Sequence, residues 1–319
     1  MRRVKKIGDR GLLTCSTKLS NGCGEYPYST VLPCNPGLSI WDNRCHLLRG
    51  MPLLKDWLGE APFSLCLSSS FFGMWCHAGV LAALCDRGLA PSKVSGSSSG
   101  ALIACWWSTT RNINTIVSTL ASITENPLSL CRLFHPNPWP GLVSIYTATK
   151  SFVRDHFPVQ RFESCDPPAF VSAWDPYRMR NRVFCEEGDL VPALAASMAV
   201  PFLFKPCLVN GAPHWDGAVS DMAGVCGLSR DDRVLYHHAT VMPVGLTPHI
   251  SQFKNLVTLK LEGLPYLHPL RLGRAMEAFH IAREATLICL DSPLPEQPGQ
   301  GKDRLVLRAA ASGAARSKL

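Results

Sequence analysis

Charged residues are scarce in this chain of 319 residues: they make up 18%, against 46% hydrophobic residues. That balance excludes a disordered or fibrous protein and allows a sizeable buried core. Acidic residues are rarest at the two ends, and residues 1–10 and 301–319 each carry a net charge of +4. Residues 11–300 hold 22 basic and 22 acidic side chains, so the formal charge of +8 lies in the ends. A neutral body is not typical of nucleic-acid-binding proteins, and no nucleic-acid partner is expected.

Long apolar runs are also missing. None approaches the ~20 consecutive apolar residues that a membrane span needs, and the run Ala101–Trp107 suits a buried core instead. The apolar stretch Gly11–Cys15 is too short for the core of a signal peptide. The basic start leaves an organelle transit peptide open, but a cytoplasmic protein is the simpler expectation. The basic ends could bring it to anionic phospholipid surfaces as a peripheral protein.

None of the 14 cysteines falls in a Cys-x-x-Cys pair, so the sequence shows no zinc site of the common spacing. The chain is also too long and too apolar to need a disulfide framework. Seven cysteines lie in apolar surroundings and are expected to be small buried hydrophobes: Cys66, Cys76, Cys85, Cys105, Cys185, Cys207 and Cys289. Four more, Cys15, Cys23, Cys34 and Cys45, are expected to be solvated thiols, with metal binding or pairing as the alternative.

The clearest pattern of elements begins at Phe63. A buried strand is expected at 63–67, a helix that is apolar nearly all round at 73–84, a short strand at 93–95 and a second apolar helix at 101–108. Strand, helix, strand and helix in close succession predict a parallel sheet with helices on its faces.

The rest of the chain is less regular. Residues 112–168 predict helices that shape a pocket entrance, and Asp189 is placed to cap a helix over 190–198. A long helix is expected over 270–288. We expect three parts: a mostly loop-like extension over 1–60, a domain over 61–295 and a flexible basic tail over 296–319. Further strands are expected at 169–174, 182–185, 207–210, 234–241 and 256–261.

The motif that carries chemistry is Gly96-Ser97-Ser98-Ser99-Gly100, which matches G-x-S-x-G. In this motif a strand turns sharply into a helix and holds the central serine in a strained conformation with its hydroxyl exposed. Gly96 and Gly100 remove side chains that would clash there. The amides at the start of the following helix favour developing negative charge. Ser98 is therefore the candidate nucleophile.

A serine hydroxyl needs a base, which is either a histidine oriented by an acid or an aspartate acting directly. Three stretches, Ser68–Leu84, Val94–Cys105 and Leu190–Ala223, together resemble the patatin-like phospholipases over residues 61–225, and more loosely to about 295. The resemblance implies a three-layer α/β/α fold with a mostly parallel sheet. It also implies that Asp216, in Asp216-Gly217-Ala218, is the base, and that no histidine, metal or organic cofactor is needed.

Residues near Asp216 offer competing interpretations. An Asp-Gly pair often forms an Asx turn, which is the structural alternative for Asp216. Asp221 is a rival base five residues on and is expected to be structural. His214 could face the same way as Asp216 along a strand, as a hydrogen-bonding neighbour. His237 and its neighbour His238 adjoin a strand and are expected to be solvated.

The chain departs from the family at the loop that forms the oxyanion hole. A glycine-rich stretch with a basic residue is usual there, whereas this chain has Ser68-Ser69-Ser70-Phe71-Phe72-Gly73. Backbone N–H groups do not depend on side chains, so Ser69, Ser70, Phe71 and Gly73 are the candidate donors. Losing one such donor costs about 10²–10³ in rate. The aromatic residues around the site are expected to be core, with an acyl-chain lining as the alternative: Phe71, Phe72, Trp75, Trp106 and Trp107.

The resemblance implies a serine lipid acyl hydrolase that cleaves esters of phospholipids or related acyl lipids through an acyl-enzyme. Two alternatives stay open. One is an α/β-hydrolase esterase with a Ser-His-Asp triad, and the other is a catalytically silent protein of the same fold that binds lipid or serves as a scaffold.

Overall fold

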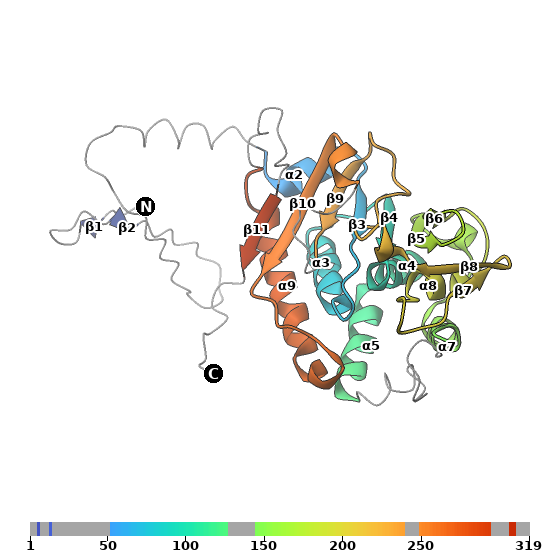
Figure 1. Cartoon of the computed structure of the whole chain (residues 1–319). Coiled ribbons are helices and arrows are strands. Elements are labelled where there is room, and N and C mark those ends of the chain that lie inside the picture. Colours follow the sequence, from blue (N-terminus) through green and yellow to red (C-terminus); the bar gives the residue numbers. More distant parts are fainter. Residues whose placement is uncertain are drawn as a thin grey trace. The chain divides into compact units, whose positions relative to one another are not determined.

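The computed structural model describes residues 5–6, 13–14, 52–126, 144–239, 249–294 and 306–310 (Figure 1). The chain divides into two units, Met1–Gly50 and Met51–Leu319. In the first unit, β1 (Lys5–Lys6) pairs antiparallel with β2 (Leu13–Thr14). The expectations for the four cysteines between residues 15 and 45 fall outside the described residues. The second unit contains the large sheet, the core and the candidate site.

A nine-stranded sheet organises the second unit, in the order β11-β10-β9-β3-β4-β5-β8-β7, with β6 added against β5. The strands from β11 to β5 are parallel to their neighbours, whereas β6, β7 and β8 form antiparallel pairs. The expected mixed α/β fold with a mostly parallel sheet is confirmed. The strands are β3 (Ser64–Leu67), β4 (Lys93–Ser97), β5 (Ala169–Asp175), β6 (Arg180–Phe184), β7 (Cys207–Val209), β8 (Ala212–Asp216), β9 (Arg233–His237), β10 (Asn255–Glu262) and β11 (Val306–Ala310).

Helices flank this sheet, and their residue patterns explain their positions (Figure 1). In α3 every residue from Trp75 to Leu84 is buried, as expected for a helix that is apolar nearly all round. In α5 only Ile116 and Leu120 are buried, and the Asn112 side chain caps its N-terminus by accepting from two backbone N–H groups. The helices are α2 (Leu54–Gly59), α3 (Met74–Asp86), α4 (Ser99–Thr110), α5 (Ile113–Glu125), α7 (Tyr146–His156), α8 (Leu190–Ser197) and α9 (Ala275–Leu290).

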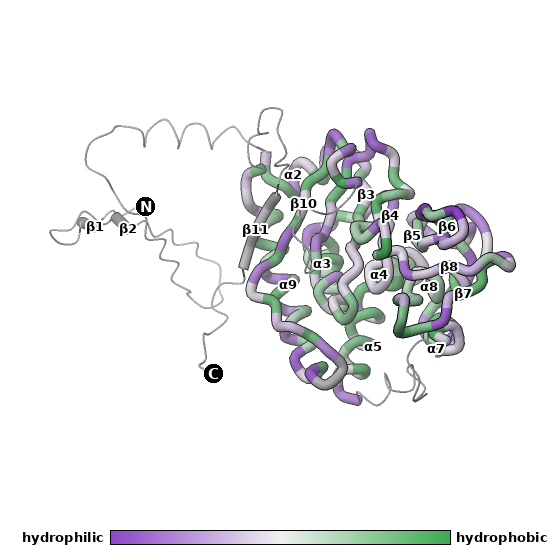
Figure 2. The backbone as a smooth tube through the Cα atoms, viewed as in Figure 1, coloured by the Kyte–Doolittle hydropathy of each residue, from purple (hydrophilic) through white to green (hydrophobic). Residues whose placement is uncertain are grey.

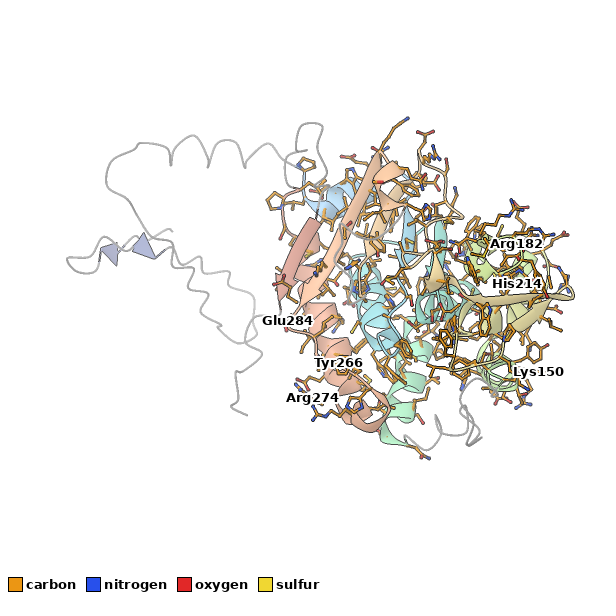
Figure 3. All side chains as sticks on the ribbon, viewed as in Figure 1. Lys150, Arg182, His214, Tyr266, Arg274 and Glu284 are labelled. Carbon is orange, nitrogen blue, oxygen red and sulfur yellow. The ribbon has the colours of Figure 1, made fainter. Side chains whose placement is uncertain are left out.

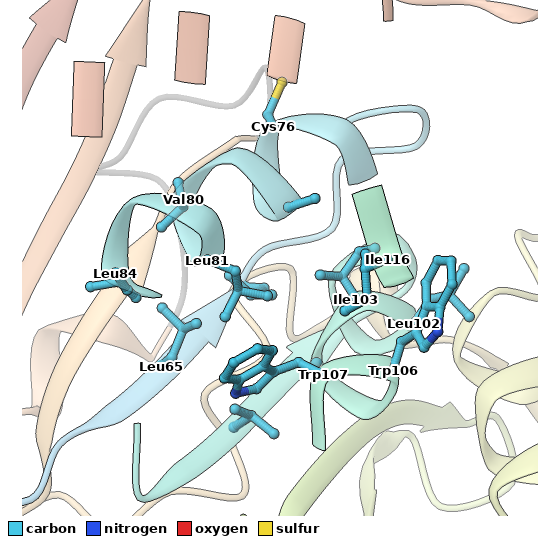
Figure 4. Close-up of a cluster of buried hydrophobic side chains, with 14 of the residues drawn as sticks. Leu65, Cys76, Val80, Leu81, Leu84, Leu102, Ile103, Trp106, Trp107 and Ile116 are labelled. Atoms are coloured by element: carbon cyan, nitrogen blue, oxygen red, sulfur yellow. The ribbon is translucent and has the colours of Figure 1, made fainter. Parts of the chain in front are cut away.

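The main hydrophobic core lies between α3, α4, α5 and the strands beside them. Hydrophobic residues gather along α3 and its neighbours, and hydrophilic residues prevail in the outer loops (Figure 2). The close-up in Figure 4 shows Leu65 of β3 beside Leu81 and Leu84 of α3, and Ile103 of α4 beside Ile116 of α5. Burial of these side chains stabilises the fold by about 1.5–3 kcal/mol each. The core therefore holds the carboxyl ends of β3 and β4 in place.

Three features differ from the sequence-based expectations. The structure separates its units after residue 50, and α2 within the expected extension packs its buried Leu54 and Leu58 in the core. The strand β11 pairs with β10 inside the segment expected to be a flexible tail. The expected cap at Asp189 is wrong, because its side chain makes no cap hydrogen bond and instead accepts from Arg161, 3.1 Å away.

Within the described ranges, no helix is both long enough and apolar enough to cross a membrane.

Candidate active site

The strand β5 brings Ser98 and Asp216 together. Residues 171–172 pair with both β4 and β6, so those strands occupy opposite edges of β5. Residues 173–174 pair with both β6 and β8, so β8 lies on the same edge as β4. On that edge Ser97 is opposite Ser172, and Asp216 is opposite the next residue, Ala173. Asp216 therefore occupies the position that the chain leaves when it turns away at Ser98.

Ser98 has the strained backbone expected at such a turn, with φ 54° and ψ −125°. A non-glycine residue adopts this conformation only where its surroundings hold it. Here the Ser98 N–H donates to Oγ of Ser197 on α8 at 2.9 Å, and that hydroxyl donates to the Ser172 carbonyl at 2.7 Å. The helix α4 begins at Ser99, so its positive end lies at the Ser98 side chain.

Two glycines of the predicted motifs allow close approach of backbones. A Cβ atom at Gly100 would collide with the carbonyl groups of Leu67 and Ser68. A Cβ atom at Gly217 would collide with the carbonyl of Ser172, on the strand β5 with which both β4 and β8 pair. Glycine at these positions therefore lets the turn after β4 and the turn after β8 pack against their neighbours.

The Asp216 carboxylate is buried, with 2% of the residue exposed. Its Oδ1 accepts the Ala218 N–H at 2.8 Å, which is the Asx turn foreseen as the structural alternative. Its Oδ2 has no hydrogen-bond partner among the described residues. Burial raises the pKa of Asp216 to about 7, and the Ala218 N–H and the nearby Ser98 hydroxyl oppose that rise. One oxygen thus shapes the turn, and the other is available to a nearby proton.

The neighbours of Asp216 have other roles. The expectation that His214 hydrogen bonds to Asp216 is wrong: its Nδ1 lies 3.0 Å from the carbonyl of Ala212. Asp221 is structural, as expected. Its carboxylate accepts backbone N–H groups from Gly224, Val225 and Cys226, at 2.9 to 3.1 Å, and so fixes the loop after the site.

Most backbone N–H groups of the serine-rich loop already donate to acceptors within the protein. The Ser69 N–H donates to the Met222 carbonyl at 2.8 Å, and the Gly73 N–H donates to the Ser70 carbonyl at 2.8 Å. The Ser70 N–H lies 3.2 Å from Oγ of Ser99, a longer and weaker contact. The Phe71 N–H has no acceptor among the described residues, and Phe71 adopts a left-handed φ of 51°. Of the four candidate donors, Phe71 has a free N–H group, and Ser70 has one that is held only by the side chain of Ser99.

A buried pair of histidines supports this loop and was not anticipated. His77 of α3 and His237 at the end of β9 are both fully buried, with their Nδ1 atoms 2.8 Å apart. Nε2 of His77 lies 2.9 Å from the Ser68 carbonyl and 3.0 Å from Ser70 Oγ. Burial lowers the pKa of His77 to about 4, and burial also lowers the pKa of His237. Both rings are therefore neutral at pH 7.

The expectation of solvated histidines at the end of β9 is wrong. His238 is 2% exposed, and its Nδ1 lies 2.9 Å from the Tyr236 hydroxyl. The sequence did contain one signal. His77 interrupts an otherwise apolar helix, and a polar side chain buried in such a helix needs a partner.

The tryptophans near the site belong to the core. Trp75 and Trp106 are fully buried and Trp107 is 5% exposed. Phe71 differs, because 57% of it is exposed. In the part of the chain that the structure describes, no three His, Cys, Asp or Glu side chains form a group that could hold a metal ion.

The fold and the two turns that follow β4 and β8 define an α/β protein with a strained serine beside a buried carboxylate. Residues 65–225 match the family described as patatin-like phospholipase, so the chain belongs to that family. Members of the family are in general lipid acyl hydrolases that act on lipid substrates.

Comparison with curated proteins found no match. Among solved structures, the chain is similar to the crystal structure of VipD from Legionella pneumophila, with 14% identity and a TM-score of 0.38. That similarity covers 68% of this chain and 52% of VipD, so the chain spans about half the length of that protein.

Proposed function

We propose that this protein hydrolyses acyl esters of phospholipids or related lipids, with Ser98 as nucleophile and Asp216 as general base. The observation that carries the proposal is the register on β5. It sets a serine of strained geometry next to a buried carboxylate whose Oδ2 has no partner among the described residues. Membership of the patatin-like phospholipase family supports the substrate class.

The reaction follows from these positions. Ser98 Oγ attacks the ester carbonyl carbon while Asp216 accepts the hydroxyl proton. The oxyanion that forms is stabilised by the N–H group of Phe71, by that of Ser70 once it leaves Ser99 Oγ, and by the start of α4. Asp216 then returns the proton to the leaving alcohol, and an acyl-enzyme remains. Water attacks this ester with Asp216 again as the base, which releases the fatty acid and restores Ser98.

A base of this kind needs a pKa near the working pH. An exposed aspartate has a pKa near 4 and is a weak base. Burial raises the pKa of Asp216 to about 7, so that the carboxylate can accept the proton of Ser98 and later release it. The described part of the site provides no histidine within hydrogen-bonding distance of Ser98.

The direct test is covalent labelling with a fluorophosphonate probe, followed by assays on a panel of lipid esters. We expect labelling and turnover in the wild type and neither in Ser98→Ala. A folded wild-type protein that resists the probe and hydrolyses none of the lipids would overturn the proposal. It would instead favour the catalytically silent alternative.

Substituting the candidate bases distinguishes the Ser-Asp dyad from the Ser-His-Asp triad. We expect Asp216→Asn to lose turnover and His→Ala substitutions at the exposed His249 and His280 and the half-buried His268 to retain it. A histidine whose removal abolishes labelling of Ser98 in a protein of unchanged stability would support the Ser-His-Asp triad instead.

A further inference from the structure

A cavity of about 230 Å³ lies among β5, β6, β7 and β8 and has no role in the dyad. One water molecule occupies about 30 Å³ of liquid, so the cavity has room for a group several times larger. Its walls include Asp175, Arg178, Arg180, Arg182 and His214. Figure 3 shows Arg182 of β6 and His214 of β8 in this part of the fold, on the two strands that flank β5.

The arginines share one side of the sheet because they alternate along the chain. Side chains two residues apart in a strand point to the same face, so Arg180 and Arg182 of β6 project together, next to Arg178 in the preceding turn. The cross-strand pairs Arg182 with Ala173 and Arg180 with Asp175 place both arginines on the face that also carries Asp175.

The charges of the cavity do not balance. Asp175 is its acidic residue, and its Oδ2 already accepts from Arg178 Nη1 at 2.8 Å. Neither Arg180 nor Arg182 forms an ion pair with any acid in the described part of the chain. His214 adds no charge at pH 7, because burial lowers its pKa although the Ala212 carbonyl and Asp175 oppose that shift. The guanidinium groups of Arg180 and Arg182 therefore line a cavity whose acidic residue, Asp175, is already paired with Arg178.

The cavity is close to the dyad along the same sheet face. Asp216 of β8 is opposite Ala173 of β5, and Ala173 is in turn opposite Arg182 of β6. His214 lies two residues before Asp216 on β8. With ~3.3 Å per residue and ~4.8 Å between strands, His214 is about 7 Å and Arg182 about 10 Å from Asp216 along the sheet. In a glycerophospholipid the phosphate is separated from the ester carbonyls by only a few bonds.

We propose that the cavity binds the phosphate group of a glycerophospholipid while Ser98 attacks one of its acyl esters. This inference rests on the proposed function, and it names the substrate as a phosphate-bearing lipid rather than a neutral acylglycerol. Guanidinium groups suit this role because they are always charged and donate paired hydrogen bonds to phosphate oxygens.

The test measures binding in the Ser98→Ala background, where no substrate is consumed. The probes are dihexanoyl phosphatidic acid and dihexanoylglycerol, which differ only in the phosphate, and inorganic phosphate is a third. We expect the phosphate-bearing lipid to bind about 10-fold or more tightly than the neutral one, as charge-assisted hydrogen bonds would give. Arg180→Gln/Arg182→Gln should abolish that difference.

The control is Arg230→Gln, which removes one positive charge from an exposed position three residues before β9. It should keep the preference for the phosphate-bearing lipid. Arg180 and Arg182 are themselves exposed, so the double variant should unfold at the wild-type temperature.

Two results would overturn the inference. One is equal affinity for both lipids, whether or not inorganic phosphate binds, and the other is a preference that survives in the double variant. Failure of the proposed function gives a different result, because an inert Ser98 would leave turnover absent in the wild type and these affinities unchanged. In an active enzyme, the ratio of kcat/KM for the two lipids should fall with the double variant and hold with the control.

Discussion

His77 and His237 lie with their Nδ1 atoms 2.8 Å apart and with both residues fully buried. Because the Ser68 carbonyl can only accept, Nε2 of His77 carries the proton of that ring. Nδ1 of His77 then accepts, so Nδ1 of His237 donates, and Nε2 of His237 has no partner among the described residues. This chain of bonds joins the end of β9 to the serine-rich loop.

His77→Phe keeps the aromatic volume but removes the donor to the Ser68 carbonyl. We expect a fall in kcat of about 10²–10³ if the loop no longer presents its N–H groups. Unfolding free energy should fall by about 1–3 kcal/mol, since a buried carbonyl loses its donor. His77→Gln retains a donor at the Nε2 position and should recover part of kcat.

The exposed His280 of α9 gives the control: His280→Phe should leave both quantities near the wild-type values. If His77→Phe lowered stability but left kcat unchanged, the histidine pair would have no part in shaping the loop.

The raised pKa of Asp216 predicts how activity depends on pH. The base must be ionised to accept the Ser98 proton, and its pKa is about 7. The value of kcat/KM on a soluble ester should therefore rise through pH 7 and level off above it. A profile that is flat from pH 5 to pH 9 would contradict Asp216 as the base.

The same burial predicts that Asp216→Asn stabilises the protein while abolishing turnover. The carboxyl has a pKa of about 7 when folded and 3.8 as its model value, so the folded state retains a proton that the unfolded state releases. Wild-type stability should fall as pH rises from 4 to 7, on the order of 1.4 kcal/mol per pKa unit of difference.

The asparagine variant lacks this slope, so its advantage should grow between pH 4 and pH 7. Thermal unfolding of both proteins at pH 4.5 and pH 8 measures the effect. An equal difference at the two pH values would show that Asp216 does not retain the proton.

Ser197→Ala tests how the strained turn is held. The variant removes the acceptor of the Ser98 N–H, and with it the donor to Ser172. We expect a loss in kcat on the order of 10-fold or more as the nucleophile shifts, and a loss of about 1–3 kcal/mol in stability. Ser118→Ala, which removes an exposed hydroxyl on α5, is the matched control. Unchanged rates in Ser197→Ala would show that other contacts hold the turn at Ser98.

Asp221→Asn tests which of the two aspartates, Asp216 or Asp221, is the catalytic base. Asp221 accepts three backbone N–H groups through both carboxylate oxygens, and an amide can serve only one of those sides. The variant should lose about 2–3 kcal/mol of unfolding free energy yet still label at Ser98 with the fluorophosphonate probe. If labelling disappears while the fold is intact, Asp221 would replace Asp216 as the candidate base.

Short-range pattern was enough to predict several elements. The run 63–67, the all-apolar helix after Gly73 and the Gly96–Gly100 turn appear in the structure as β3, α3 and the junction of β4 with α4. These elements follow from local hydrophobicity and from glycines at a crowded turn. The membership in the patatin-like family was also visible in three motifs and is confirmed over residues 65–225.

The predictions that failed depended on residues far away in the sequence. His214 was expected to bond to Asp216 and His237 to be solvated, but a donor's acceptor and a strand's burial depend on neighbours that only the sheet order supplies. The strand β11 pairs with β10 across a long interval of chain, which local composition does not encode.

The sequence by itself determined which residues could do chemistry: a serine between two glycines and an aspartate before a glycine. The tertiary structure decided where they lie. One edge of β5 is shared by β4 and β8, so Asp216 follows Ser98 in space although 118 positions separate them in the chain. It also decided their electrostatics, since burial raises the pKa of Asp216 and the pairing of β5 with β6 gathers the arginines nearby.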